Sequence, residues 1–171
     1  MDRRIYVLRH AKSSWDDPHL ADHDRPLNDR GRAALPKLER ALTPEGDGID
    51  VVLCSSAART VATLEGVRGA LRPEVEVVVD EALYGASADT WLQRCQDLDD
   101  SVGGALLIGH NPGVGELIDR LTGSGEDEAL EQLASKVPTG ALARCAFAGA
   151  WAQLGSDTCH LEALLVPKRL P

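Results

Sequence analysis

The sequence predicts an α/β fold, a three-layer α/β/α sandwich whose sheet is mostly parallel. Short, continuous runs rich in Val, Ile and Leu, which are typical of buried parallel strands, alternate with helical patterns through the first two thirds of the chain. The last third carries two longer β-like runs joined by a turn. This change predicts antiparallel strands at an edge of the sheet.

Four segments are predicted to be the parallel strands. Each is short and almost entirely apolar, as expected for a strand that is buried on both faces. Helical patterns fill the gaps between the strands and follow the last one. The predicted strands are residues 5–8, 51–54, 75–79 and 105–108, and the predicted helices are residues 30–42, 57–71, 88–98 and 115–121.

Residues that commonly precede or interrupt helices support these boundaries. Asn28 and Ser87 can cap the first and third helices, the pair Ser55-Ser56 precedes the second, and Pro112 precedes the fourth. Pro36 lies inside the first helical pattern. Because proline lacks an N–H donor, we expect it to kink or shorten that helix.

The last third is expected to form a hairpin. Residues 143–154 and 160–166 read as strands, and Gly155-Ser156-Asp157 between them reads as the turn. The polar stretch 123–128 is expected to be an exposed loop. His160 lies within an apolar strand pattern and is expected to be a partly buried structural histidine.

Length and composition are those of one soluble globular domain covering residues 1–171. The chain is 43% apolar and 26% charged, and no run approaches the roughly 18 apolar residues that span a bilayer. The first residues, Met1-Asp2-Arg3-Arg4, lack the features of a signal peptide. We therefore expect a cytoplasmic protein that does not insert into membranes, with its four widely spaced cysteines reduced and buried.

The distribution of charge argues against nucleic acid as a partner. The chain has 18 basic and 27 acidic residues and a formal net charge of −9, and its basic residues are scattered. The electrostatic footprint of a nucleic-acid-binding protein is therefore missing. Any anion is expected to be held by a local group of basic side chains. The sequence does not indicate an oligomeric state.

Basic and imidazole side chains follow three of the predicted strands. His10 follows the first strand, Arg59 lies in the turn after the second, and His110 follows the fourth. Open α/β sheets bind ligands beyond the carboxyl ends of their strands. Arg9 adds a second guanidinium beside His10. Two converging arginines fit the forked, multi-oxygen geometry of a phosphoryl group.

This group of residues predicts phosphoryl transfer. A histidine close to two fixed cations has its charged form disfavoured, so His10 is expected to be neutral near pH 7 and able to attack phosphorus. His110 can donate a hydrogen bond to an oxygen of the phosphoryl group. Together with Arg9 and Arg59, it would stabilise the transition state without a metal ion. Either histidine alone would more often be a structural residue, and the joint pattern carries the prediction.

Four motifs in this chain resemble those of the histidine phosphatase superfamily, and among its members those of the SixA-type phosphohistidine phosphatases. They occur in the expected order between residue 5 and about residue 120, and together they are specific although each alone is weak. The motifs are Leu8-Arg9-His10-Ala11-Lys12-Ser13-Ser14-Trp15, Arg25-Pro26-Leu27-Asn28-Asp29-Arg30-Gly31, Ser55-Ser56-Ala57-Ala58-Arg59-Thr60 and Gly109-His110-Asn111-Pro112-Gly113.

The resemblance implies a phosphoglycerate-mutase-like fold and no cofactor. It implies that His10 forms a covalent phosphohistidine, and that Arg9, Arg59 and His110 complete the phosphate pocket. Asn111 of the last motif is expected to contribute to substrate binding.

Two positions depart from the usual pattern of the family. Ala11 replaces a glycine, as is common in SixA-like members, and Asp16 stands where many relatives have an asparagine. An anionic Asp16 near the phosphate would repel it unless the side chain points away or pairs with Lys12 or Arg25.

The leaving group decides which substrate is expected. An alkoxide needs a general acid, whereas an imidazole, whose conjugate acid has a pKa of about 6.5, needs far less help. Relatives that act on phosphate esters carry an acid after the third strand, and here Asp80 and Glu81 lie in that segment. We choose Glu81 as the candidate acid. A small phosphate ester, a sugar or nucleotide derivative, is thus the alternative substrate.

Chain length favours a protein substrate. Between the third and fourth strands there is room for one helix and little else, so a capping insertion is not expected, although the loop 16–24 could fold over the site. An open pocket suits a phosphohistidine displayed on another protein, such as a histidine phosphotransfer domain. A third reading is a module that binds phosphohistidine without hydrolysing it. A metal site at His19 and His23 is disfavoured, because these residues lie in a loop between prolines.

Overall fold

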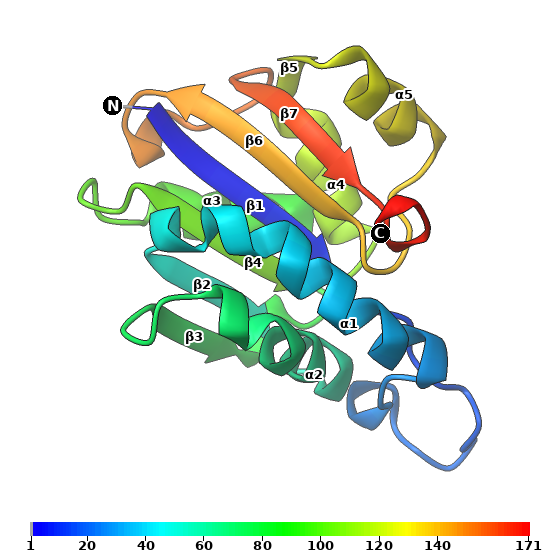
Figure 1. Cartoon of the computed structure of the whole chain (residues 1–171). Coiled ribbons are helices and arrows are strands. Elements are labelled where there is room, and N and C mark those ends of the chain that lie inside the picture. Colours follow the sequence, from blue (N-terminus) through cyan, green and yellow to red (C-terminus); the bar gives the residue numbers. More distant parts are fainter. Residues whose placement is uncertain (1) are drawn as a thin grey trace.

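A seven-stranded mixed sheet forms the middle layer of the molecule (Figure 1). The structure is a computed structural model and describes residues 2–171. The strand order is β3-β2-β4-β1-β6-β7-β5, with β6 antiparallel to both of its neighbours and the other pairs parallel. The strands are β1 (Asp2–Arg9), β2 (Val51–Ser55), β3 (Glu76–Asp80), β4 (Gly104–Gly109), β5 (Thr122–Gly125), β6 (Leu142–Ala148) and β7 (Cys159–Leu165).

Helices cover both faces of this sheet, which confirms the predicted α/β/α sandwich (Figure 1). Alternate residues of β1 point into two separate hydrophobic cores, with Ile5 and Val7 in one and Tyr6 and Leu8 in the other. The core that contains Tyr6 and Leu8 includes α1 (Asp29–Leu42) and α2 (Ala58–Val67). The core that contains Ile5 and Val7 includes α3 (Ala88–Gln96), α4 (Gly113–Leu121) and α5 (Asp127–Ser135). Short 3-10 turns complete the fold: η1 (Asp22–Asp24), η2 (Thr43–Gly48), η3 (Arg68–Ala70), η4 (Glu81–Leu83), η5 (Trp151–Gln153) and η6 (Pro167–Arg169).

The four predicted parallel strands lie side by side, as expected. β1 pairs with β4 so that Arg9 lies opposite Gly109, and β2 pairs with the other side of β4. The residues that follow β1 and β4 therefore leave the same edge of the sheet in register. This register places His10 beside His110.

The first helix, α1, begins where the sequence predicts, because the Asn28 side chain accepts a hydrogen bond from the Gly31 N–H at 2.8 Å. Pro36 does not shorten it: the helix continues to Leu42. Pro36 itself is exposed, whereas Leu38 and Leu42 beyond it are buried in the core. This packing retains the last turns of the helix beyond the proline.

Other helix ends differ from the predictions by a few residues. The second helix ends at Val67 rather than residue 71, because its last turn becomes the 3-10 turn η3. The third ends at Gln96 rather than residue 98 and has the predicted cap, the Ser87 side chain. The fourth begins at Gly113, two residues earlier than expected, directly after Pro112.

The last third contains the main errors of the sequence-based prediction. The strand β6 ends at Ala148, and the residues after it form η5, where Trp151 is buried and donates a hydrogen bond from Nε1 to the Val102 carbonyl. The predicted turn at 155–157 is therefore part of a longer connection. The strands β6 and β7 are antiparallel, as predicted, but β5 rather than the hairpin occupies the edge of the sheet.

Residues 123–128 were expected to form a loop because they are polar, but the structure shows regular elements there. They contain most of β5, which pairs with β7, and the first turn of α5, a helix that the sequence analysis missed. Few apolar side chains mark this helix, and only Ala129 and Gln132 are buried. His160, expected to be partly buried, is exposed and contacts Ser124 and Glu126.

The expectation that the cysteines are buried agrees with the structure. All four cysteines are buried and free. Within residues 2–171, no helix combines the length and the apolarity needed to cross a membrane.

The contact of α1 with the loop after β1 generates a prediction about stability. A Cβ atom at Gly31 would overlap the backbone carbonyl oxygen of Lys12. We therefore expect Gly31→Ala to lower the free energy of unfolding by about 1–3 kcal/mol, as overpacking typically does, measured by urea denaturation. Gly48→Ala is the matched control, since no atom lies within 4 Å of its added Cβ. Equal stability of the two variants would show that α1 does not require this close approach.

Candidate active site

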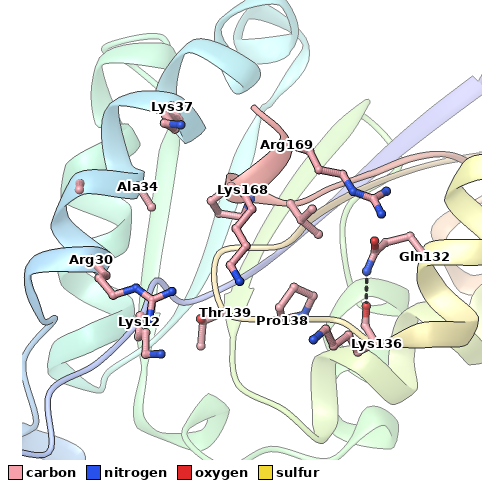
Figure 2. A pocket seen from close by; sticks show the side chains of 13 residues that line it. Lys12, Arg30, Ala34, Lys37, Gln132, Lys136, Pro138, Thr139, Lys168 and Arg169 are labelled. Carbon is pink, nitrogen blue, oxygen red and sulfur yellow. Dashed lines mark hydrogen bonds between the residues drawn. The ribbon is translucent and has the colours of Figure 1, made fainter. Parts of the chain in front are cut away.

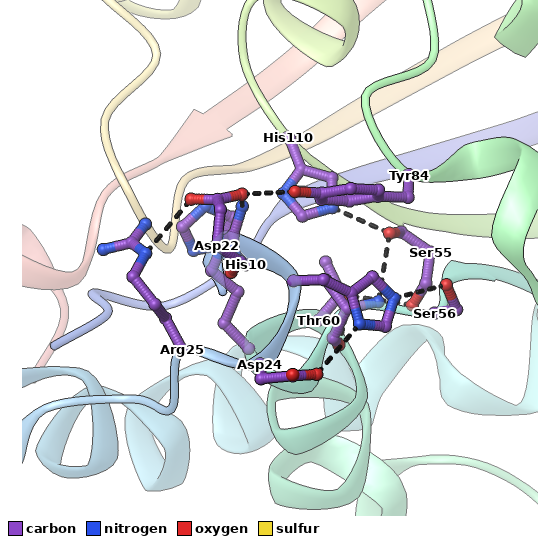
Figure 3. Close-up of polar contacts among 12 residues, drawn as sticks. His10, Asp22, Asp24, Arg25, Ser55, Ser56, Thr60, Tyr84 and His110 are labelled. Atoms are coloured by element: carbon purple, nitrogen blue, oxygen red, sulfur yellow. Dashed lines mark hydrogen bonds and ion pairs between the residues drawn. The ribbon is translucent and has the colours of Figure 1, made fainter. Parts of the chain in front are cut away.

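Two histidines and a serine meet where the neighbouring strands β1, β4 and β2 end (Figure 3). The ring centroids of His10 and His110 are 5.2 Å apart, and both side chains are buried. His110 Nε2 lies 2.7 Å from the hydroxyl oxygen of Ser55, the last residue of β2. The structure thus brings together the two histidines that the sequence singled out.

The backbone sets the orientation of the His10 ring. His10 Nδ1 lies 2.6 Å from the carbonyl oxygen of Ala11. Because a carbonyl oxygen only accepts hydrogen bonds, Nδ1 carries the proton and Nε2 keeps its lone pair. The Ala11 N–H in turn donates to the Thr63 hydroxyl at 3.0 Å, which ties the strand end to α2.

The two arginines of the predicted site are held by different partners. Arg9 donates from Nη1 to the carbonyl oxygen of Val137 at 2.9 Å. Arg59, in the first turn of α2, donates from Nη1 to the backbone carbonyl of Asp22 at 2.7 Å and from Nη2 to its carboxylate at 3.1 Å. Thr63 accepts the Ala11 N–H and donates to the Arg59 carbonyl, so it links both arginine-bearing elements.

Three buried nitrogens of this site have no hydrogen-bond partner within residues 2–171. They are Arg9 Nε, Arg59 Nε and His110 Nδ1. A buried polar atom without a hydrogen-bond partner costs about 1–3 kcal/mol, so three of them in one site indicate a place for a polar ligand. Two of the three belong to cations, and the free His10 Nε2 adds a nucleophile. The arrangement suits an anion with several oxygen atoms.

Both imidazoles are neutral at physiological pH. Burial, with smaller contributions from Arg59 and Arg9, lowers the pKa of His10 to about 4, against the opposing effect of the Ala11 hydrogen bond. Burial likewise lowers the pKa of His110 to about 3, with Arg59 as the next cause. The direction agrees with the sequence analysis, but burial rather than the neighbouring arginines is the larger cause.

A carboxylate that the sequence analysis missed organises the outer side of the site. Asp22, in η1, binds Arg59 and also accepts from Arg25 Nε at 3.1 Å and from the Tyr84 hydroxyl (Figure 3). These contacts, the Tyr84 hydrogen bond first, lower the pKa of Asp22 to about 2 although the side chain is half-exposed. Because Asp22 lies in an irregular loop far from Tyr84 in sequence, only its position three residues before Arg25 could have indicated it.

Tyr84 joins this network to His110. Its ring packs edge-on against His110, with centroids 5.6 Å apart, and against His23 at 4.9 Å. The hydrogen bond to Asp22 raises the pKa of Tyr84, so the phenol stays protonated and donates. The residues after β3 therefore reach the site through an aromatic hydroxyl.

The loop 16–24 does fold toward the site, as the sequence analysis allowed. It brings Asp22 and His23, and His23 Nε2 lies 2.9 Å from the Ser56 hydroxyl. The preceding Trp15 is 76% exposed, and the Arg25 guanidinium stacks on it. Arg25 Cζ lies 3.4 Å from the centroid of the Trp15 ring. Within residues 2–171, no group of three or more His, Cys, Asp or Glu side chains is arranged to hold a metal ion.

Three other residues that the sequence analysis singled out are exposed, unlike His10 and His110. Asn111 uses its side-chain amide on the backbone, donating to the Val137 carbonyl at 2.9 Å and accepting from the Gly115 N–H at 3.1 Å. Glu81 is exposed and opens η4. Asp16 is exposed and does not pair with Arg25, whose partners are Asp22 and the Ser14 carbonyl.

The neutral histidines predict how stability depends on pH. The unfolded chain binds protons at histidine near pH 6.5, whereas folded His10 and His110 bind them near pH 4 and pH 3. The free energy of unfolding should therefore fall as the pH drops below 6.5. Urea denaturation between pH 7 and pH 4.5 should show a shallower fall for the double variant His10→Asn/His110→Asn. The same slope in both proteins would contradict the neutral state of these rings.

Comparisons with known proteins agree with this geometry. The model of the histidine phosphatase superfamily (branch 1) matches residues 5–103. An uncharacterized protein of Mycobacterium leprae is 34% identical, over an alignment that covers 94% of this chain and 100% of that protein.

Solved structures show the same likeness. The structure assigned as the phosphohistidine phosphatase SixA of Agrobacterium tumefaciens has a TM-score of 0.79 and 30% identity, covering 96% of this chain and 98% of that one. The corresponding structure from Nakamurella multipartitia has a TM-score of 0.80 and 26% identity, covering 98% and 97%. Because the family model matches more than half of the sequence, the chain belongs to the histidine phosphatase superfamily.

Proposed function

We propose that this chain is a metal-independent phosphatase that removes the phosphoryl group from a phosphohistidine on another protein. The observation that carries the proposal is that three buried, unpartnered nitrogens, Arg9 Nε, Arg59 Nε and His110 Nδ1, occur in one site together with the free Nε2 of His10. The two guanidiniums supply the positive charge that metal ions supply in many other phosphoryl-transfer sites.

In the first step, His10 Nε2 attacks phosphorus and the bond from phosphorus to the substrate imidazole breaks. The ring reacts in its neutral form, because burial keeps its pKa far below 7. The negative charge on the phosphoryl oxygens is stabilised by N–H groups of Arg9, Arg59 and His110. The departing imidazole takes up a proton from solvent, since its own basicity is sufficient near neutral pH.

In the second step, a water molecule attacks the phosphohistidine formed on His10. The bond from phosphorus to Nε2 breaks, inorganic phosphate leaves, and the neutral ring is restored. The Ala11 carbonyl keeps the Nδ1 proton in place through both steps, so the same tautomer is ready for the next turnover. Asp22 acts as a positioning residue, because it holds the Arg59 guanidinium through two hydrogen bonds.

The openness of the site supports a protein substrate, such as a histidine phosphotransfer domain. Between β3 and β4 the chain forms only η4 and α3, so no inserted domain covers the pocket. Trp15 and Tyr84 are exposed beside it, and large exposed aromatic side chains are typical of surfaces that bind proteins. The SixA structures that resemble this chain are assigned the same activity.

The alternative substrate is a small phosphate monoester with Glu81 as the general acid. Its support is positional: Glu81 opens the turn η4, and Tyr84, which follows that turn, contacts His110. Glu81 is exposed, so its carboxyl group is open to a ligand from solvent. The two substrate classes differ in whether this carboxyl group is needed.

The covalent intermediate predicts that phosphate can be trapped on the protein. A brief pulse with ³²P-labelled phosphoramidate, quenched in alkali, should leave acid-labile label on the wild-type chain and none on His10→Ala. Turnover by His10→Ala should fall by about a thousandfold or more. His160→Ala, a change at an exposed histidine outside the site, is the control and should label normally. A chain that binds phosphohistidine peptide without ever acquiring label would be a binding module.

The role of Glu81 is tested by comparing two substrates. If the chain is a phosphohistidine phosphatase, Glu81→Gln should leave kcat/KM for phosphoramidate within about twofold of wild type, because the leaving nitrogen needs little acid catalysis. The ester should be a sugar phosphate. p-Nitrophenyl phosphate is unsuitable, because its leaving group is a stable anion that needs little acid catalysis. A wild-type preference for the sugar phosphate that collapses in Glu81→Gln would establish the alternative.

A further inference from the structure

A groove of about 570 Å³ lies beside the site, between α1, the loop before β6 and the C-terminal turn η6 (Figure 2). The chain contains four lysines, and all four line this groove. They come from elements far apart in sequence and are joined there by two arginines. The six cations are Lys12, Arg30, Lys37, Lys136, Lys168 and Arg169.

Within residues 2–171, five of these six cations lack the carboxylate partners that most arginines of this chain have, and only Arg169 pairs with one, Glu128, at 3.7 Å. No Asp or Glu lines the groove. Within residues 2–171, the side chains of Lys12, Arg30, Lys136 and Lys168 make no hydrogen bond or ion pair. In a chain with a net charge of −9, six cations around a groove that no carboxylate lines create a local positive field in an acidic surface.

The loop that forms one wall of the groove contacts the strand end that carries His10. Lys12 follows His10 by two residues, and Arg9 donates to the Val137 carbonyl in the loop that forms the other wall. The Gly140 N–H of that loop contacts the backbone carbonyl oxygens of Arg9 and His10, at 3.1 and 2.9 Å. A ligand in the groove would therefore lie next to the residue that receives the phosphoryl group.

The chemistry of the groove fits an acidic peptide better than a nucleic acid. Its floor includes Pro138, Val166 and Pro167, which offer apolar surface to a polypeptide, while the ammonium groups offer partners to carboxylates. Lysine is a flexible point charge and does not require the planar oxygen geometry that arginine selects in phosphate recognition. A long polyanion would also meet the acidic surface beyond the groove.

We propose that this lysine groove binds an acidic segment of the phosphorylated protein substrate and thereby places its phosphohistidine at His10. This inference rests on the proposed function, and it adds a recognition site that the pocket itself does not provide. It explains why a chain with an acidic surface keeps all its lysines in one place. Electrostatic attraction of this kind acts mainly on association and weakens as salt is added.

The binding test uses two fluorescent peptides of equal length, one with glutamates and one with glutamines on both sides of a central histidine. Fluorescence anisotropy should show that the glutamate peptide binds the full chain and that its Kd rises with salt. Lys136→Glu/Lys168→Glu should weaken this binding by about tenfold or more. The single variant Lys168→Glu should also weaken binding of the glutamate peptide. Arg120→Glu is the matched control and should leave binding unchanged, because it changes the charge equally at an exposed position outside the groove.

A turnover test separates the groove from the active site. With both peptides phosphorylated on histidine, the glutamate peptide should have the higher kcat/KM, and Lys136→Glu/Lys168→Glu should remove this advantage. Phosphoramidate, which is too small to span both places, should be hydrolysed at the wild-type rate by this variant. That result also shows that the variant is folded.

The outcomes distinguish the two proposals. Equal binding of the glutamate and glutamine peptides would overturn the groove as an acidic-peptide site, as would preferential binding of an oligonucleotide or tripolyphosphate there. Retained binding of the glutamate peptide, with no hydrolysis of either phosphopeptide, would overturn the proposed function and leave the groove as a peptide site.

Discussion

The site depends on buried positive charge that the protein does not fully neutralise. Arg59 is buried and Arg9 half-buried at the end of the sheet, and each keeps a buried Nε–H group without a partner within residues 2–171. Burying such groups costs free energy unless a ligand completes their hydrogen bonds. The surrounding fold supplies that energy through two hydrophobic cores and a strand register that places His10 beside His110. The result is a pocket organised before an anion arrives.

Asp22 shows how this charge is kept in place. Its carboxylate and its backbone carbonyl together hold the Arg59 guanidinium, while Tyr84 and Arg25 hold the carboxylate. A negative charge this close would weaken phosphate binding if it faced the phosphoryl group. Asp22 instead occupies the terminal nitrogens of Arg59 and leaves Nε without a partner. The same residue thus limits the motion of a cation and preserves its capacity to bind an anion.

Different parts of the structure were predictable from sequence to different degrees. Parallel strands and the strand-end residues were predictable, because runs such as Ile5 to Leu8 are buried on both faces and their carboxyl ends must share an edge. The helix α5 was not, because its burial comes from packing on β7 rather than from a strong apolar pattern. Asp22 was missed for a related reason: its role arises from contacts with Arg59 and Tyr84, which are distant in sequence.

The most direct measurement follows the three unpartnered nitrogens while inorganic phosphate is added. In ¹⁵N NMR spectra of the chain, the Nε–H signals of Arg9 and Arg59 and the Nδ1 signal of His110 should shift together, with one common Kd. Arg3 and Arg72 also have buried, unpartnered Nε groups but lie outside the site, and their signals should stay in place. If phosphate leaves the Arg9, Arg59 and His110 signals unchanged, or shifts all arginines alike, the phosphoryl site described here is wrong.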